Sequence, residues 1–145
     1  MLATSTYSKA YVDACRSRIA LQVSAYENLV AAAKGGTAGS ASPVRTAIDA
    51  LEPLYFGNLL IALDAHFVHR LRAAEGKDGN PLNEVRMLCA SMMTNNGVLS
   101  ADKTINYTPA KAVLKIEVGQ PIRFTARGFA LLSEAFLAEI ERKYR

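Results

Sequence analysis

The chain has few of the residues that usually carry recognisable chemistry: its 145 residues include two cysteines, two histidines and no tryptophan. Cys15 and Cys89 stand among apolar residues of expected helices and form no CxxC or other metal-type spacing. We therefore expect reduced, packed thiols in place of a disulfide or a zinc cluster. The nucleotide-binding patterns GxGxxG and GxxxxGK[ST] and the nucleophile pattern GxSxG are also absent, so no common enzyme class is indicated.

Other absences concern location and partners. No apolar run approaches the roughly 20 residues of a membrane span. The N-terminus, MLATSTYSKAYVDACR, has no apolar signal-peptide core. We therefore expect a cytoplasmic protein with no membrane contact. The net charge is +4, but Lys and Arg are interleaved with Asp and Glu, so nucleic acid is not a favoured partner.

What the chain does have is helical periodicity. Half of its residues are apolar, enough for one core, so residues 1–145 are expected to form a single domain. The first helix is expected between Ser5 or Thr6 and Lys34, with an apolar stripe at three- and four-residue steps. The stripe consists of Val12, Cys15, Ile19, Val23, Tyr26, Val30 and Ala33. GGTAGSAS, residues 35–42, follows and is expected to be a flexible loop.

Prolines and capping residues divide the remainder. Pro43 is expected to open a short helix over 44–51, and Pro53 to start or kink the next, over 54–75. A further helix begins at Asn80 and Pro81 and ends at TNNG, residues 94–97. The last helix begins after the cap Thr125. Its core stripe is Phe129, Leu132, Phe136 and Ile140.

Between these last two helices the period changes. The runs KTINYTP, AVLKIEV and PIRFTA favour short β-strands, with Pro109 and Pro121 keeping them at an edge. The expected fold class is therefore mainly α: a helical bundle with a small β-hairpin inserted before the C-terminal helix.

The densest charge lies at the corner HRLRAAEGKDGNPLNEVR, residues 69–86. Its turn residues have a structural explanation, because KDGN makes a tight turn and Asn80 caps a helix. On the expected helix over 54–75, however, Asp64 and Arg70 fall within the apolar face and must find partners. Glu84 and Arg86 are the nearest candidates.

Two interpretations of this corner stay open. In one, the charges form a network that fixes two antiparallel helices in register. In the other, they line a pocket for a small anionic ligand, because arginine offers paired donors to an anion. The candidate ligand-binding residues are Asp64, Arg70, Asp78, Glu84 and Arg86.

A metal site is an alternative. His66 and His69 are three residues apart on the expected helix, so both rings could touch one divalent ion. A closed site would need carboxylates such as Asp64, Glu75 or Glu84, and would point to a metal-binding protein or a metal-dependent enzyme. A third alternative is a nucleic-acid accessory protein. It would use Arg70, Arg72, Lys77 and Arg86.

Three segments resemble a group of small bacterial helical-bundle proteins. They are HFVHRLRAAEGKDGNPLNEVRMLC, VLKIEVGQPIRFT and LLSEAFLAEIERKY, and the resemblance extends from about residue 51 to the C-terminus. It implies a helical fold, but that group has no assigned activity, so the resemblance assigns no functional residue.

Taken together, the residues favour a non-enzymatic interaction or small-ligand-binding domain that forms a homodimer. Leu21 and Leu131 lie off the main stripes of their helices, and Leu137 does so to a lesser degree. Extra apolar positions of this kind suggest a subunit interface.

Overall fold

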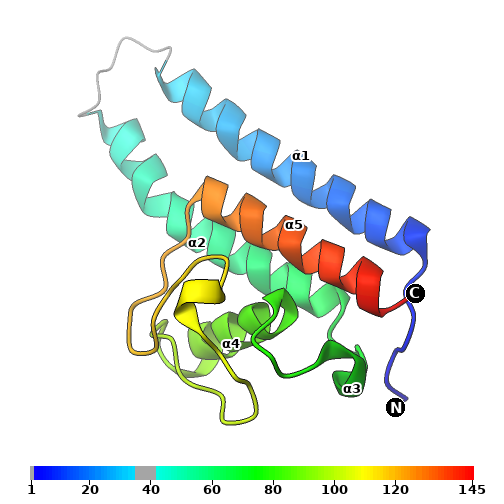
Figure 1. Ribbon diagram of the computed structural model, residues 1–145. Coiled ribbons are helices and arrows are strands. Elements are labelled where there is room, and N and C mark those ends of the chain that lie inside the picture. Colours follow the sequence, from blue (N-terminus) through cyan, green and yellow to red (C-terminus); the bar gives the residue numbers. More distant parts are fainter. Residues whose placement is uncertain (1, 35–41) are drawn as a thin grey trace.

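The computed structural model describes residues 2–34 and 42–145, so all of the expected flexible loop over 35–42 except Ser42 lies outside the described residues. The described chain is mainly α. Its elements are α1 (Lys9–Lys34), α2 (Pro43–His66), α3 (Arg72–Glu75), α4 (Pro81–Thr94), the 3₁₀ turn η1 (Pro109–Lys111) and α5 (Ala126–Lys143). Figure 1 shows α1, α2 and α5 side by side, with α4 and the irregular segment 95–125 gathered on one side.

The first helix has the expected apolar stripe. Val12, Cys15 and Tyr26 are buried, and the other four members pack against the same core. The helix begins later than expected, because its cap is neither Ser5 nor Thr6. Instead, the Ser8 hydroxyl accepts a hydrogen bond from the N–H of Tyr11, 3.1 Å away. Such a cap satisfies one of the backbone donors left free in the first turn.

The second helix replaces the two helices expected over 44–51 and 54–75, and it differs from them at Pro53 and at its C-terminal end. It runs through Pro53 without a break, and its cap is Ser42, which accepts from the N–H of Arg45 at 3.1 Å. It then ends at His66, nine residues before the expected end at Glu75. The N-terminal segment explains this end, because the N–H of Thr4 donates to the carbonyl of His69 at 2.7 Å and Thr4 forms a bridge with Arg70. A backbone paired with another segment cannot continue the helical ladder.

Both ends of the described chain meet at this turn. The N–H of Leu71 donates to the carbonyl of Thr4 at 2.8 Å, and the Tyr144 hydroxyl donates to the carbonyl of Leu71 at 2.8 Å. The N–H of Tyr7 in turn donates to the carbonyl of Tyr144 at 2.9 Å. Figure 1 shows the N- and C-termini at the same end of the bundle.

Among the described helices, α2 is long and apolar enough to cross a membrane by length and composition alone. Its mean hydropathy is 1.2 over an 18-residue window, of which 28% is buried inside the structure. A helix packed in the core of a soluble protein passes the same test. The charged side chains of α2 are few, so its apolar character extends beyond its core-facing side.

The expected β-hairpin is wrong, because residues 98–126 form no strand. The extended pairing there is a single bridge between Val98 and Pro121. Two amides of the expected strand 112–118, those of Val113 and Leu114, instead donate to the carboxylate of Glu84 at 2.8 and 2.9 Å. Lys115 then has a φ of 56°, which interrupts an extended strand. The segment is therefore an irregular loop whose backbone is satisfied by a buried side chain.

The last helix places its stripe in the core as expected. Thr125 caps α5 by accepting from the N–H of Gly128 at 3.0 Å. The stripe residues Phe129, Leu132, Phe136 and Ile140 are all buried. Leu137 is buried as well, so it is not an interface candidate, whereas Leu21 and Leu131 are 72% and 53% exposed.

Candidate functional site: the charged corner around Glu75

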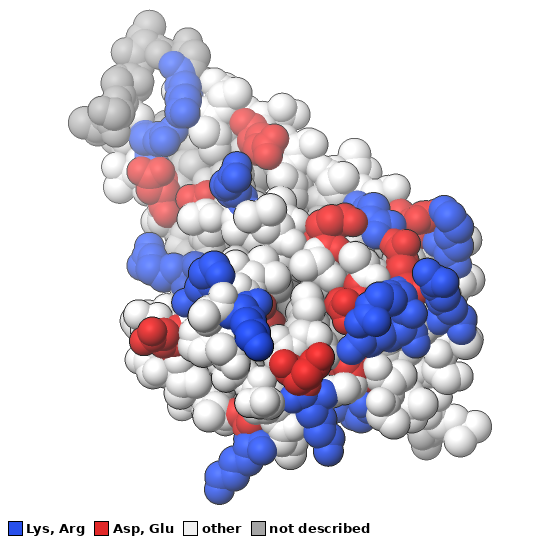
Figure 2. Space-filling view, in the orientation of Figure 1, with Lys and Arg blue, Asp and Glu red and all other residues white. Residues whose placement is uncertain are grey.

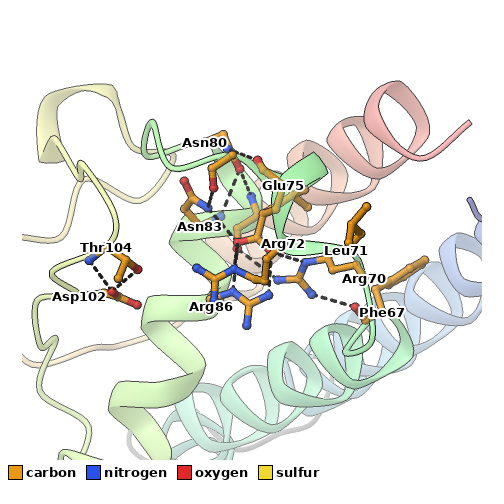
Figure 3. Close-up of polar contacts among 12 residues, drawn as sticks. Phe67, Arg70, Leu71, Arg72, Glu75, Asn80, Asn83, Arg86, Asp102 and Thr104 are labelled. Carbon is orange, nitrogen blue, oxygen red and sulfur yellow. Dashed lines mark hydrogen bonds and ion pairs between the residues drawn. The ribbon is translucent and has the colours of Figure 1, made fainter. Parts of the chain in front are cut away.

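Short-range turn chemistry builds the corner between α3 and α4. Asn80 caps α4, and its side-chain oxygen accepts from the amides of Leu82 and Asn83 at 2.9 and 3.2 Å. Gly76 and Gly79 have φ values of 82° and 83°, a region that residues with a Cβ rarely adopt. These tight turns place Glu75, at the end of α3, next to Asn83 and Arg86 of α4 (Figure 3).

Glu75 is the centre of the corner. Its side chain is completely buried, and its carboxylate accepts four hydrogen bonds. Arg70 Nε lies 2.8 Å and Arg86 Nη2 2.7 Å from Oε1, while Arg86 Nε lies 3.0 Å and Asn83 Nδ2 2.8 Å from Oε2. Hydrogen bonds to a charged group are stronger than those between neutral groups, and here each carboxylate oxygen accepts two of them.

Arg70 is the second buried charge. Its Nη1 donates to Asp64 Oδ1 at 2.9 Å and to the carbonyl of Phe67 at 3.1 Å, and its Nη2 donates to the carbonyl of Leu82 at 3.4 Å. Its guanidinium carbon lies 5.3 Å from the centre of the Phe136 ring, within cation–π range. The donors of Arg70 therefore point at protein partners.

The charges of this corner also balance. The two carboxylates, Asp64 and Glu75, are matched by two guanidinium groups, those of Arg70 and Arg86. The side chains of Arg70 and Glu75 have no exposed surface. Burial by itself would raise the pKa of Glu75. The hydrogen bond from Arg86 and the charges of Arg70 and Arg86 outweigh burial and lower that pKa to about 2. Glu75 is therefore ionised throughout the physiological pH range.

The structure brings together three of the five predicted ligand-binding residues: Asp64, Arg70 and Arg86. Asp78 lies apart, where its carboxylate accepts from Asn80 Nδ2 at 2.7 Å. Glu84 is buried but faces the 95–125 loop, so its expected pairing with Arg70 is wrong.

Sequence reasoning missed the two residues that complete the network, Glu75 as its centre and Asn83 as a donor. From the sequence alone, Glu75 is a candidate only as a metal ligand. Its place directly before Gly76 puts it at the end of a helical segment, next to the turn that forms the corner. The sequence contained no comparable signal for Asn83.

The histidine pair does not form the expected helical site. His66 is the last residue of α2, and its Nδ1 lies 2.6 Å from the carbonyl of Ala62 while its Nε2 lies 3.0 Å from Arg18 Nη1. His69 lies in the turn beyond the helix and is exposed. Within residues 2–34 and 42–145, no group of three or more His, Cys, Asp or Glu side chains is arranged to hold a metal ion. The premise of two rings on one helical face is therefore wrong.

The four cations of the nucleic-acid alternative are divided. Arg70 and Arg86 are bound to Glu75, while Arg72 and Lys77 line a surface hollow of about 470 Å³ with Ala73 and Thr104. Figure 2 shows Lys and Arg interspersed with Asp and Glu over the face in view. This mixture lacks the single-sign stripe typical of a nucleic-acid interface.

No protein-family model, no curated protein and no solved structure matches this chain. The geometry of the corner is therefore the basis of its proposed function.

Proposed function

We propose that this protein is a small non-enzymatic interaction domain in which the charged corner is a structural brace. The observation that supports the brace is the carboxylate of Glu75, whose four hydrogen-bond donors come from Arg70, Arg86 and Asn83. An arginine that binds a ligand must present donors to solvent or to a cavity. Arg70 presents its donors to protein acceptors instead, so they tie the turn after α2 to α3 and α4.

The brace is tested by Arg70→Ala. We expect the free energy of unfolding at pH 7 to fall by about 3–5 kcal/mol, because the change leaves Glu75 buried with fewer counter-charges. The matched control is Arg72→Ala. Arg72 is 46% exposed at its side chain and its Nε lies 4.0 Å from Glu75 Oε2, so the loss should stay below about 1 kcal/mol. An Arg70→Ala protein as stable as the wild type would contradict the brace.

A second candidate function is the binding of a small anion in the hollow next to the brace. The hollow of about 470 Å³ favours this function because Arg72 and Lys77 both line it. Inorganic phosphate is the probe. If the hollow binds anions, phosphate raises the melting temperature of the wild type and has no effect on an Arg72→Ala, Lys77→Ala double variant. Equal changes in the melting temperatures of the two proteins would exclude anion binding in the hollow.

We further propose a cytoplasmic location, as the composition suggests. This proposal is supported by Cys15 and Cys89, which are both free and buried. Burial raises the pKa of the Cys89 thiol well above its usual value, so the thiol stays protonated and unreactive. Free, protected thiols are typical of proteins in a reducing compartment.

A further inference from the structure

The side of α2 that faces away from the core has a regular apolar pattern. Its members follow one another at alternating steps of three and four residues, which places them on one face of a helix. They are Val44, Ala47, Leu51, Leu54, Asn58, Ile61 and Ala65. Six of the seven are exposed, and Ile61 is partly buried. We call this face of α2 the outer seam.

The outer seam is separate from the side of α2 that forms the core. The core side consists of Ile48, Phe56, Gly57, Leu60 and Leu63, all buried. In the outer seam, Val44, Leu51 and Leu54 are 56%, 39% and 67% exposed. A helix that is apolar on both sides is typically buried on both sides. The exposed leucines therefore indicate that another surface covers the seam.

We propose that a second copy of this chain covers the outer seam, with α2 of each subunit packed against α2 of the other. The proposal rests on the interaction-domain function proposed above and names the partner. The three–four spacing is the heptad pattern of a two-stranded coiled coil, in which Val44, Leu51, Asn58 and Ala65 occupy the a positions and Ala47, Leu54 and Ile61 the d positions. Val44 and Leu54 follow the combination of valine at a and leucine at d that favours a pair of helices, whereas the other five positions do not follow it.

The charge of the seam suits contact with an identical surface. In a two-fold symmetric interface each patch meets its own copy, so like charges would face each other and repel. None of the seven seam residues is charged. The charged residues of α2 occupy other positions of the helix: Arg45 pairs with Asp49, Asp64 pairs with Arg70, and Glu52 lies outside the seam.

The size of the face also suits a dimer. The seam spans residues 44–65, about 33 Å at 1.5 Å per residue. The neighbouring helix α1 runs beside α2, as the hydrogen bond from the Tyr55 hydroxyl to the carbonyl of Gln22 shows, and it exposes Leu21. Two adjacent helices present a width of about 20 Å. The face offers at most about 650 Å² per subunit, or about 1,300 Å² in total, which reaches the lower end of the range of stable interfaces.

Asn58 distinguishes a second copy from a lipid surface as the occupant. A membrane would leave the amide of Asn58 in hydrocarbon without a partner, which is unfavourable. In a parallel pair of helices each a residue meets its own copy, so the two Asn58 amides can bond to each other. A single asparagine at an a position fixes register in this way. An antiparallel pair would set Asn58 opposite an apolar d residue such as Ala47 or Leu54, so the amide favours the parallel arrangement.

The first test is Leu54→Glu, measured by sedimentation equilibrium over about 1–100 µM chain. We expect the wild type to have twice the 15.7 kDa mass of the chain and Leu54→Glu to have the mass of one chain, with an unchanged helical circular dichroism spectrum. The matched control is Leu131→Glu, because Leu131 is 53% exposed on α5, outside the seam. This control should remain a dimer. A monomeric wild type, or a dimeric Leu54→Glu, would overturn the proposal.

The second test fixes the orientation. Under mild oxidation, Leu51→Cys should form a covalent dimer, because residue 51 meets its own copy in a parallel pair. The wild type should form none, because both of its cysteines are buried. A Leu51→Cys dimer that stays non-covalent would overturn the parallel pairing.

The experiments distinguish a failure of the dimer proposal from a failure of the brace proposal. A monomeric wild type that floats with vesicles of phosphatidylcholine and phosphatidylglycerol would replace the second copy by a lipid surface. A monomeric wild type that does not float would exclude both a second copy and a lipid surface as the partner of the outer seam. In either case the stability of Arg70→Ala still decides separately whether the corner is a brace.

Discussion

Replacing Glu75 by glutamine should destabilise the fold strongly without changing the shape of the side chain. In Glu75→Gln one oxygen becomes an amide group that cannot accept from Arg86 or Asn83. Arg70, whose side chain has no exposed surface, keeps only the partly exposed Asp64 as a counter-charge. A buried charge that loses its partner typically costs about 3–5 kcal/mol.

The pKa of Glu75 gives a second route to this magnitude. That pKa is about 2 in the folded protein against an ordinary value of 4.5. Each unit corresponds to about 1.36 kcal/mol, so the ionised carboxylate stabilises the fold by about 3 kcal/mol. Because the folded pKa is lowered, this stabilisation is fully present above pH 4.5 and is lost as the pH falls toward 2. Glutamine cannot titrate, so the variant lacks this dependence.

Urea denaturation followed by circular dichroism at pH 7, 4 and 2.5 measures both effects. We expect the wild type to exceed Glu75→Gln by about 3 kcal/mol at pH 7, with the difference shrinking toward pH 2.5. The control is Glu134→Gln, because Glu134 pairs with Arg16 at a side chain that is 62% exposed, and it should change stability by less than about 1 kcal/mol. A pH-independent difference, or one below about 1 kcal/mol at pH 7, would refute the reasoning.

Two further changes test the parts of the fold that hold the corner. Gly79→Ala should lower the melting temperature more than Gly119→Ala: both glycines have positive φ, but a Cβ at Gly79 would lie 2.6 Å from the carbonyl oxygen of Asn106, while nothing lies within 4 Å at Gly119. Equal shifts of the two melting temperatures would contradict the steric argument. Glu84→Ala should cost about 1–3 kcal/mol, because it leaves two loop amides without an acceptor. It should also speed amide hydrogen exchange at those amides, and unchanged exchange there would show that Glu84 does not hold the loop.

The features that the sequence predicted correctly depend on residues close together in the chain. Asn80 and Thr125 cap their helices as expected, because a cap bonds to an amide two or three residues away. The core stripes of α1 and α5 follow directly from helical periodicity. Such features need no knowledge of how distant segments meet.

The features that the sequence failed to predict depend on contacts between segments far apart in the chain. The helix over 54–75 ends early because Thr4 pairs with the backbone around Arg70, and the expected strand at 112–118 is lost because Glu84 binds its amides. The candidate site shows the same division. Two charged residues within an apolar face, Asp64 and Arg70, indicated that charges pair at the corner. Their centre at Glu75 depends on the early end of α2, which the contact with Thr4 explains.

The meeting of the two chain ends at the turn 69–71 has a consequence for synthesis on the ribosome. Thr4 and Tyr7 emerge first, yet their hydrogen-bond partners include the backbone of Tyr144. Helices α1 and α2 can form early, but α5 supplies much of the core against which they pack. The domain therefore closes only after residue 144 has left the exit tunnel, so until then the nascent chain exposes apolar helices of the kind that chaperones bind.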